Sequence, residues 1–404
     1  MKKDFRFSIF DFRLPFCRSV NRASQIKNPK LWALGAGALV CGLLAAIWLA
    51  TSTRPERLIG PYLQAVTEES VYVLVECAAA GTARVEYGPT ASYGSSAQAE
   101  AVAPTASSTF VHKIKLSGLR PDTVYHYRAW RNETPCADAT FRTLVPPGTG
   151  FRFAVLGDLR TGTNVHDTIS RRLLGVDRPL LSLYLGDLCY DGSCRSYKKE
   201  FFRADELALD AGVAFFSATG NHEGWGINTK AFTQAPSSLS GRQGYYSFDC
   251  GDLHVLVLNC CLEYTSRSPQ YRFAQTDLAG ANRAWKVVLF HCPAYCGGGH
   301  GEDLSFQAMT SDVFEPNGVT LVLSGHSHFY QHNLVNGIHH LVVGSSGAQL
   351  YEPESAPYTL KTVKDYSYGI GDVTPTNLHF VVYNDRGAVL DTLDLERRRM
   401  KDER

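Results

Sequence analysis

The sequence lacks an excess of charge of either sign. Its 404 residues contain 40 Lys and Arg against 39 Asp and Glu, so the formal net charge is +1. A chain with this balance has no global basic field, and we expect no binding to nucleic acid. It also lacks an internal repeat, which argues against a repeat architecture. Charge is dense only at 396–404, which we interpret as a solvated tail.

Only one uncharged apolar run is long enough to cross a bilayer. It covers 31–51, and its 21 residues span about 31 Å at about 1.5 Å per residue. The leader at 1–30 contains eight Lys or Arg against two acidic residues, which predicts a cytoplasmic leader and an external chain after Thr51. We therefore predict a signal anchor at 31–51. The alternative is a cleaved signal peptide, which would leave a secreted protein.

The cysteines are compatible with both an uncleaved anchor and a cleaved signal peptide. In either case the chain after residue 51 would be periplasmic, lumenal or extracellular, where disulfides persist. Nine cysteines follow the anchor, and this odd number leaves at least one free or paired between chains. Cys77 and Cys136 could pair with each other. Cys189 and Cys194 have the spacing of a zinc half-site or of a small disulfide, and spacing alone leaves both open.

Residues 57–146 are predicted to form a β-sandwich. Short runs with alternating apolar residues, such as 71–76 and 124–130, are separated by Gly, Pro, Thr and Ser, which is typical of this architecture. The stretch LSGLRPDTVYHYRA, at 116–129, has a Leu, a Pro-Asp turn and a Tyr at the start of a strand. It resembles the tyrosine corner of fibronectin type III domains. The alternative is another small β-sandwich.

A different pattern follows the Pro- and Gly-rich stretch at 144–150. From 147 to 395, solid apolar runs such as FAVLG and LLSLYLG alternate with segments of helical type. Continuous apolar strands indicate a sheet that is covered on both faces, so we predict an α/β domain here.

The apolar runs end in polar residues that could bind metal. In α/β sheets the loops at the carboxyl ends of strands converge on the ligand site, so we expect these side chains to lie together. They are too many for one ion and suit two metals about 3.5–4 Å apart, which is a known arrangement for displacement at phosphorus. The residues are Asp158, Asp187, Tyr190, Asn221, His222, His291, His326 and His328.

In this order the motifs D, GDxxY, GNHE, H and GHxH resemble those of the metallophosphoesterases. The Tyr of the second motif, Tyr190, resembles the purple acid phosphatase branch. The resemblance covers about 57–395 and implies a four-layer αββα catalytic domain after the fibronectin-like sandwich. It also implies two metal sites that share Asp187. The first would consist of Asp158, Asp187, Tyr190 and His328, and the second of Asp187, Asn221, His291 and His326.

The residue types are consistent with the metals that this resemblance implies. A phenolate is a hard, anionic ligand that suits Fe(III), and Arg160 stands where most metallophosphoesterases have a His ligand instead. The second site is less charged and suits a divalent ion such as Fe(II), Zn(II) or Mn(II).

The resemblance also implies hydrolysis of phosphate esters, with phosphomonoesters favoured and a metal-bound hydroxide attacking phosphorus in line. His222 matches the substrate-contacting His, and His300 is a candidate general acid for the leaving group. Arg160 is a candidate phosphate ligand. A disulfide between Cys189 and Cys194 is expected, and the vicinal pair Cys260-Cys261 and the pair Cys292 and Cys296 are likewise expected to form disulfides in preference to binding metal.

Three alternatives differ in class or substrate. The same fold could hydrolyse phosphodiesters or nucleotides, because pocket shape decides between these substrates and monoesters. An inert adhesion or receptor ectodomain would have a broken ligand set, and none of the seven ligand positions is broken. A structural zinc protein would use the cysteines as ligands.

Overall fold

The computed structural model describes residues 57–236 and 244–397. These described residues belong to one compact unit. The predicted leader and anchor at 1–51 lie outside the described residues and stay predictions. Within the described part of the chain, no helix combines the length and the apolar character needed to cross a bilayer.

The segment predicted as a sandwich consists of strands in two sheets. One sheet has the order β1-β2-β6-β5, and the other has β4-β3-β7-β8, with β9 also paired to β7. The Tyr125 hydroxyl accepts a hydrogen bond from Arg120 N at 3.0 Å, which is the contact expected of a tyrosine corner. The closer likeness to fibronectin type III stays a prediction. The strands are β1 Tyr62–Gln64, β2 Ser70–Cys77, β3 Ala83–Gly88, β4 Ser95–Gln98, β5 Ala101–Pro104, β6 Phe110–Ser117, β7 Val124–Arg131, β8 Thr134–Pro135 and β9 Ala139–Arg142.

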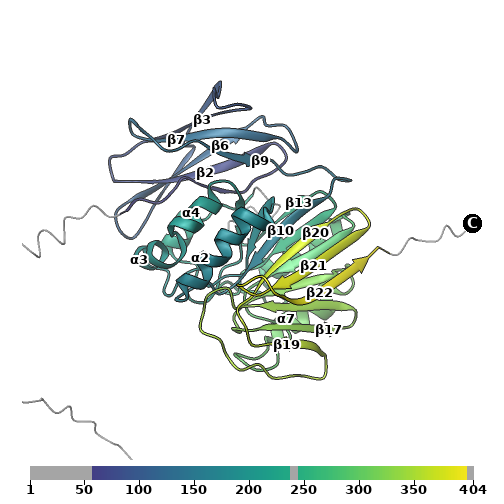
Figure 1. Ribbon diagram of the computed structural model, residues 1–404. Coiled ribbons are helices and arrows are strands. Elements are labelled where there is room, and N and C mark those ends of the chain that lie inside the picture. The colour runs from purple at the N-terminus through teal and green to yellow at the C-terminus, as the bar shows by residue number, and fades with distance from the viewer. Residues whose placement is uncertain (1–56, 237–243, 398–404) are drawn as a thin grey trace, which may run out of the picture. The chain divides into compact units, whose positions relative to one another are not determined.

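The region that follows the sandwich contains two mixed sheets (Figure 1). The first has the order β22-β21-β20-β10-β11-β12 and continues through β1 into the sandwich, because β1 pairs with β12 in parallel. Its strands are β10 Phe151–Leu156, β11 Leu181–Tyr184, β12 Ala214–Ser217, β20 Tyr368–Val373, β21 Asn377–Tyr383 and β22 Val389–Glu396.

The second sheet has the order β13-β14-β15-β16-β18-β17-β19, with parallel pairing from β14 through β15 and β16 to β18. Its strands are β13 Tyr246–Cys250, β14 Leu253–Val257, β15 Trp285–Leu289, β16 Leu321–Ser324, β17 Tyr330–Val335, β18 Ile338–Val343 and β19 Thr359–Val363.

Helices cover the outer faces of both sheets. Phe153 and Val155 of β10 join the core between the sheets, whereas Ala154 and Leu156 join a core that contains Ile169 of α2. A third core packs β14 and β15 against α6 and α7. The prediction that these strands are covered on both faces is therefore confirmed. The helices are α2 Thr163–Arg172, α3 Cys194–Ser196, α4 Ala204–Asp210, α5 Ile227–Phe232, α6 Pro269–Gly280 and α7 Leu304–Met309, with π-helical turns η1 Leu173–Asp177, η2 Tyr197–Phe201 and η3 Thr310–Phe314.

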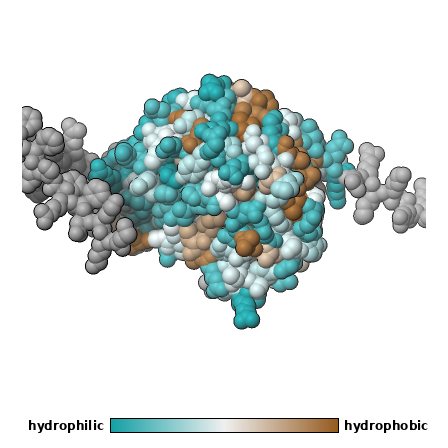
Figure 2. Space-filling view, turned by 90° about the horizontal axis from the view of Figure 1, so that it is seen from below, coloured by the Kyte–Doolittle hydropathy of each residue, from teal (hydrophilic) through white to brown (hydrophobic). Residues whose placement is uncertain are grey.

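The surface has no dominant apolar area on the face seen in Figure 2. Hydrophilic residues cover most of that face, and the hydrophobic residues form separate, smaller patches. Single exposed apolar residues of this kind are normal for a globular protein and need no special explanation.

Asn228, on α5, connects the sandwich to the loop that contains Gly192 and Cys194. Its side-chain Nδ2 donates to Gly192 O at 2.9 Å, and its Oδ1 accepts from Cys194 Sγ at 3.0 Å. The same Oδ1 also accepts from Ala106 N, in the sandwich, at 2.8 Å. The loop that carries Tyr190 is therefore restrained by these contacts with Asn228 and the sandwich, in addition to the strand that precedes it.

A buried polar network fixes α2 and α4 against β11. Glu206 accepts hydrogen bonds from Ser170 Oγ at 2.6 Å and from the Tyr184 hydroxyl, and its Oε2 lies 2.8 Å from His166 Nε2. Asp210, one turn further along α4, is fully buried. Burial and the neighbouring Glu206 carboxylate raise the pKa of Asp210 well above its usual value, which favours the protonated form of this carboxyl group.

Asp210→Asn should make the free energy of unfolding fall less steeply as the pH rises. The folded state keeps a proton on Asp210 that the unfolded chain releases above about pH 4, so the free energy of unfolding falls by about 1.4 kcal/mol per pH unit from that source. This contribution is complete at low pH and is lost as pH rises toward the folded pKa. Urea denaturation between about pH 5 and pH 8 should show a flatter pH dependence for the variant. Asp205→Asn, on the same helix at a more exposed position, is the matched control, and equal slopes for Asp210→Asn and wild type would contradict a protonated Asp210.

Candidate metal centre

The first sheet contributes two aspartates to the candidate site. Asp158 follows β10 and Asp187 follows β11, and both side chains are buried. Both have left-handed backbone conformations, with φ of 56° and 54°. Non-Gly residues in this region are uncommon and cluster at functional sites. Asp158 N donates to Gly186 O at 3.1 Å, so the two loops run side by side and bring the carboxylates together.

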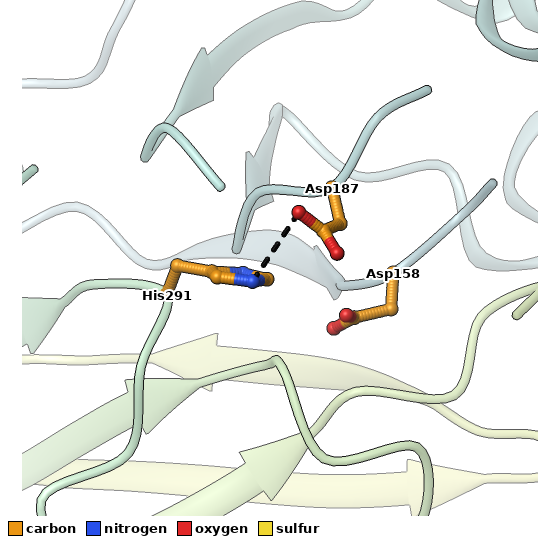
Figure 3. A group of neighbouring side chains, drawn as sticks. All are labelled: Asp158, Asp187 and His291. Atoms are coloured by element: carbon orange, nitrogen blue, oxygen red, sulfur yellow. Dashed lines mark ion pairs between the residues drawn. The ribbon is translucent and has the colours of Figure 1, made fainter. Parts of the chain in front are cut away.

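Asp187 lies at the centre of the contacts. Its Oδ1 accepts a hydrogen bond from His222 N at 3.0 Å and lies 3.3 Å from His291 Nε2. Its Oδ2 accepts from Arg160 Nε at 3.1 Å. Figure 3 shows how His291 reaches Asp187 from the second sheet, with Asp158 on the other side of the same carboxylate.

His291 contacts the other two side chains, Asn221 and His326, that are predicted with it as ligands of the second metal. Its Nδ1 donates to Leu185 O at 2.8 Å, which leaves Nε2 facing the site. That Nε2 lies 3.0 Å from Asn221 Oδ1 and 3.2 Å from His326 Nδ1. Burial alone would lower the pKa of His291, but the Asp187 and Asp158 carboxylates outweigh it and raise that pKa. Burial and His291 lower the pKa of His326 to about 3, so His326 is neutral and has lone pairs to offer.

Asp158 and His328 form the other end of the group. Asp158 Oδ2 accepts from His326 N at 2.8 Å, and its Oδ1 lies 3.4 Å from His328 Nε2. His328 Nδ1 donates to Gln349 O at 2.7 Å, so its Nε2 also faces inward. Asp158 Oδ1 is buried and has no hydrogen-bond partner.

These residues fit a metal ion. A buried carboxylate oxygen without a partner is costly unless it is paired or coordinates a metal. Ligand atoms of Asp158, Asp187 and His291 all lie within 4.8 Å of one another. Carboxylate oxygens and imidazole nitrogens suit Fe, Zn and Mn, and no cysteine belongs to this group.

Tyr190 is the predicted ligand that the structure does not bring into the group. Its side chain is 54% exposed, and its ring lies beside His222, with centroids 5.5 Å apart. His222 Nδ1 lies 2.5 Å from Tyr190 O. Within 57–236 and 244–397, no contact joins the Tyr190 hydroxyl to Asp158 or Asp187. Its role as a metal ligand therefore stays a prediction.

Arg160 and His300 both reach the group. Arg160 is 9% exposed, and its Nη2 lies 3.3 Å from His328 Nε2. The His300 ring is stacked on that of His326, with centroids 4.3 Å apart and planes at 28°. Burial and His328 lower the pKa of His300. Both residues lie where they could contact a molecule bound at the metal group.

Two residues at the site were not assigned a role from the sequence. Glu223 is buried, and its Oε1 accepts from Gly220 N at 2.7 Å and from Asp187 N at 3.1 Å, which fixes the two loops to each other. Burial and Asp187 raise the pKa of Glu223 to about 8. The Tyr351 ring lies on that of His328, with centroids 4.1 Å apart. The GNHE motif contained a signal for Glu223, whereas no motif marks Tyr351.

All nine cysteines of the described residues are free thiols in the structure. The Cys194 thiol donates to Asn228 Oδ1 and does not pair with Cys189. The disulfides expected from the sequence stay predictions.

Comparison with known proteins agrees with a metal centre formed by the loops that follow the strands. Residues 151–330 match the family described as calcineurin-like phosphoesterase. Purple acid phosphatase 23 of Arabidopsis thaliana is 28% identical over 269 residues, which cover 56% of this chain and 58% of the relative. Purple acid phosphatase 21 of the same plant is 31% identical over 241 residues, which cover 55% and 53%. The chain therefore spans a little over half the length of these two relatives.

Solved structures show the same fold. The purple acid phosphatase PPD1 from seeds of yellow lupin (Lupinus luteus) has a TM-score of 0.71 at 19% identity, covering 85% of this chain and 75% of that one. The structure of PhoD has a TM-score of 0.61 at 12% identity, covering 84% and 92%. The predicted resemblance is confirmed for the catalytic region: the chain contains a calcineurin-type metallophosphoesterase domain that is similar to those of purple acid phosphatases.

Proposed function

We propose that this chain hydrolyses phosphate esters, with phosphomonoesters favoured, at a binuclear metal centre. The observation that carries the proposal is the buried convergence of Asp158, Asp187 and His291, in which Asp158 Oδ1 has no hydrogen-bond partner. Two sheets deliver these residues to one place, and the surrounding histidines direct their Nε2 atoms or side chains at the same space. Such a donor set is suited to holding cations beside a phosphate group.

The proposed metals are Fe(III) together with Fe(II), Zn(II) or Mn(II). One relative, 26% identical over 265 residues, is the Fe(3+)-Zn(2+) purple acid phosphatase 12 of Arabidopsis thaliana. When bound, the ions would polarise the phosphoryl group and make a nucleophile available at neutral pH. The contacts divide as the proposed ligand sets do: His291 meets Asn221 and His326 on one side of Asp187, and Asp158 meets His328 on the other.

The chain's own side chains would bind the ester and move protons. Arg160, which now contacts Asp187, is the cation best placed to bind a phosphate oxygen. The His222 ring lies 3.9 Å from Asp187 Oδ2 and faces the same space. His300, stacked on His326 at the exposed side, would protonate the leaving oxygen.

The test of this function is turnover by the metal-loaded, full-length chain. We expect hydrolysis of p-nitrophenyl phosphate to exceed that of bis(p-nitrophenyl) phosphate, with about two metal ions per chain by elemental analysis. Asp187→Asn should lower activity by more than about a hundredfold, because even the loss of an outer-shell partner costs about 10–100-fold. Asp191→Asn, at an exposed position of the same loop, is the control. A metal-loaded chain that turns over no phosphate ester would refute the proposal.

Tyr190→Phe should remove the visible colour of the iron-loaded protein. A phenolate bound to Fe(III) gives a charge-transfer band, so wild type should be pink to purple if Tyr190 turns from His222 toward Asp187. Tyr351→Phe is the matched control, because that ring also borders the site, on His328. Loss of the band in Tyr351→Phe and not in Tyr190→Phe would show that the ligand is Tyr351. Iron-loaded wild type without a band would contradict the ferric–phenolate assignment.

His300→Ala should slow the hydrolysis of esters with poor leaving groups most. A general acid contributes about 10²–10⁴-fold when the leaving oxygen needs a proton, and p-nitrophenolate needs little help. We expect kcat for an alkyl phosphate to fall by about that factor and kcat for p-nitrophenyl phosphate to change far less. An equal fall for both substrates would indicate that His300 only supports His326.

A further inference from the structure

Three cysteines lie at the ends of two neighbouring strands, next to the metal group. β14 and β15 pair in parallel, with Val257 opposite Leu289. The pairing continues past the strands, because Leu258 N donates to Leu289 O at 2.9 Å. Cys260 and Cys292 each follow the paired residues by three positions. The register therefore places these two cysteines side by side.

The thiol contacts agree with the register. The Cys260 thiol interacts with the thiols of both Cys261 and Cys292. Cys260 Sγ also lies 3.5 Å from Thr219 O, and Cys261 Sγ lies 3.2 Å from Gly220 O. All three cysteines are free thiols. We call this group, Cys260, Cys261 and Cys292, the thiol cluster.

The thiol cluster touches two loops that carry proposed metal ligands. Thr219 and Gly220 directly precede Asn221, and Cys292 directly follows His291. Asn221 Oδ1 and His291 Nε2 are 3.0 Å apart. A covalent bond between Cys260 and Cys292 would therefore anchor the loop that carries His291 to the neighbouring loop after β14.

We propose that Cys260 and Cys292 form a reversible disulfide that ties the His291 loop to the loop after β14 and so controls how firmly the second metal is held. The existence of the bond is independent of the proposed function. Its effect on the metal rests on that function.

Geometry selects this pair over the pairs that lie closer in the sequence. Disulfides need Cα atoms about 4.4–6.8 Å apart, and neighbouring strands are separated by about 4.8 Å. The Cα atoms of Cys260 and Cys261 are consecutive, and a trans peptide holds such atoms about 3.8 Å apart. Cys296, the other partner suggested for Cys292, directs its thiol to Gly298 O at 3.7 Å and contacts Ser327.

The reaction is a thiol–disulfide exchange. Cys260 and Cys292 each lose a proton, one S–S bond forms, and the two electrons reduce a disulfide oxidant such as oxidised glutathione to two thiols. The contact with Cys292 and burial, which outweigh the opposing effect of Cys261, raise the pKa of Cys260, and contact with Cys260 raises that of Cys261. The extent of the exchange is measured at equilibrium, in buffers of fixed redox potential.

The test is disulfide mapping of the full-length chain after equilibration with a series of glutathione redox buffers. We expect a peptide that links Cys260 to Cys292 in oxidising buffer and its disappearance in reducing buffer. Cys260→Ser and Cys292→Ser should each abolish this peptide. Cys261→Ser and Cys296→Ser are matched controls and should keep it. Links between Cys260 and Cys261 or between Cys292 and Cys296, or no link at all, would overturn the proposal.

The effect on the metal is measured separately, by the zinc retained against a chelator. Zinc retention should be about tenfold greater in the oxidised chain than in the reduced chain, and this difference should vanish in Cys292→Ser and persist in Cys296→Ser. Equal retention with the link present would overturn control of the metal while leaving the disulfide established. A chain that carries the link but binds no metal in either redox state would count against the proposed function instead.

Discussion

The carboxylate of Asp187 connects three loops of the candidate centre. Its two oxygens contact His222 N, Arg160 Nε and His291 Nε2, and the backbone N–H of Asp187 donates to Glu223. The three groups that contact the oxygens come from three different loops, so the position of each depends on the same carboxylate. A buried carboxylate is tolerated only with such compensation. The contacts around Asp187 therefore compensate a charge that burial removes from water.

The two-sheet architecture explains why the compensation is possible. Asp158, Asp187 and Asn221 follow strands of the first sheet, and His291, His326 and His328 follow strands of the second. Ligands from only one sheet would lie in a row along one edge. Packing two sheets face to face brings two rows together, which encloses the carboxylates between imidazoles. The sandwich adds a further restraint, because Asn228 joins Ala106 to the loop that carries Tyr190.

Much of the catalytic fold and of the candidate site could be predicted from the sequence, because the same local pattern recurs along the chain. Each apolar run that ends in Asp, Asn or His marks one strand and one loop, and strand ends converge by general topology. Side chains on flexible or exposed segments are not constrained in that way. Tyr190 keeps the motif spacing, yet its ring lies beside His222, because half-exposed side chains are positioned by neighbours that no spacing rule describes. Tyr351 comes from a segment without a motif, and the continuation of the first sheet through β1 depends on pairing far apart in the chain.

Arg160 brings a positive charge to the buried carboxylates. Asp158 and Asp187 are both buried, and the guanidinium contacts Asp187 Oδ2 while it lies against His328 Nε2. These are two of the atoms that the first metal of the proposed centre would use. A cation held at these atoms would compensate the charge on Asp187, and Arg160 would then be available to bind a phosphate oxygen. The His found at this position in most metallophosphoesterases would serve as a ligand in the loaded site, but as a neutral imidazole it would compensate neither carboxylate without metal. In the proposed centre, Arg160 would therefore replace a metal ligand with a permanent positive charge.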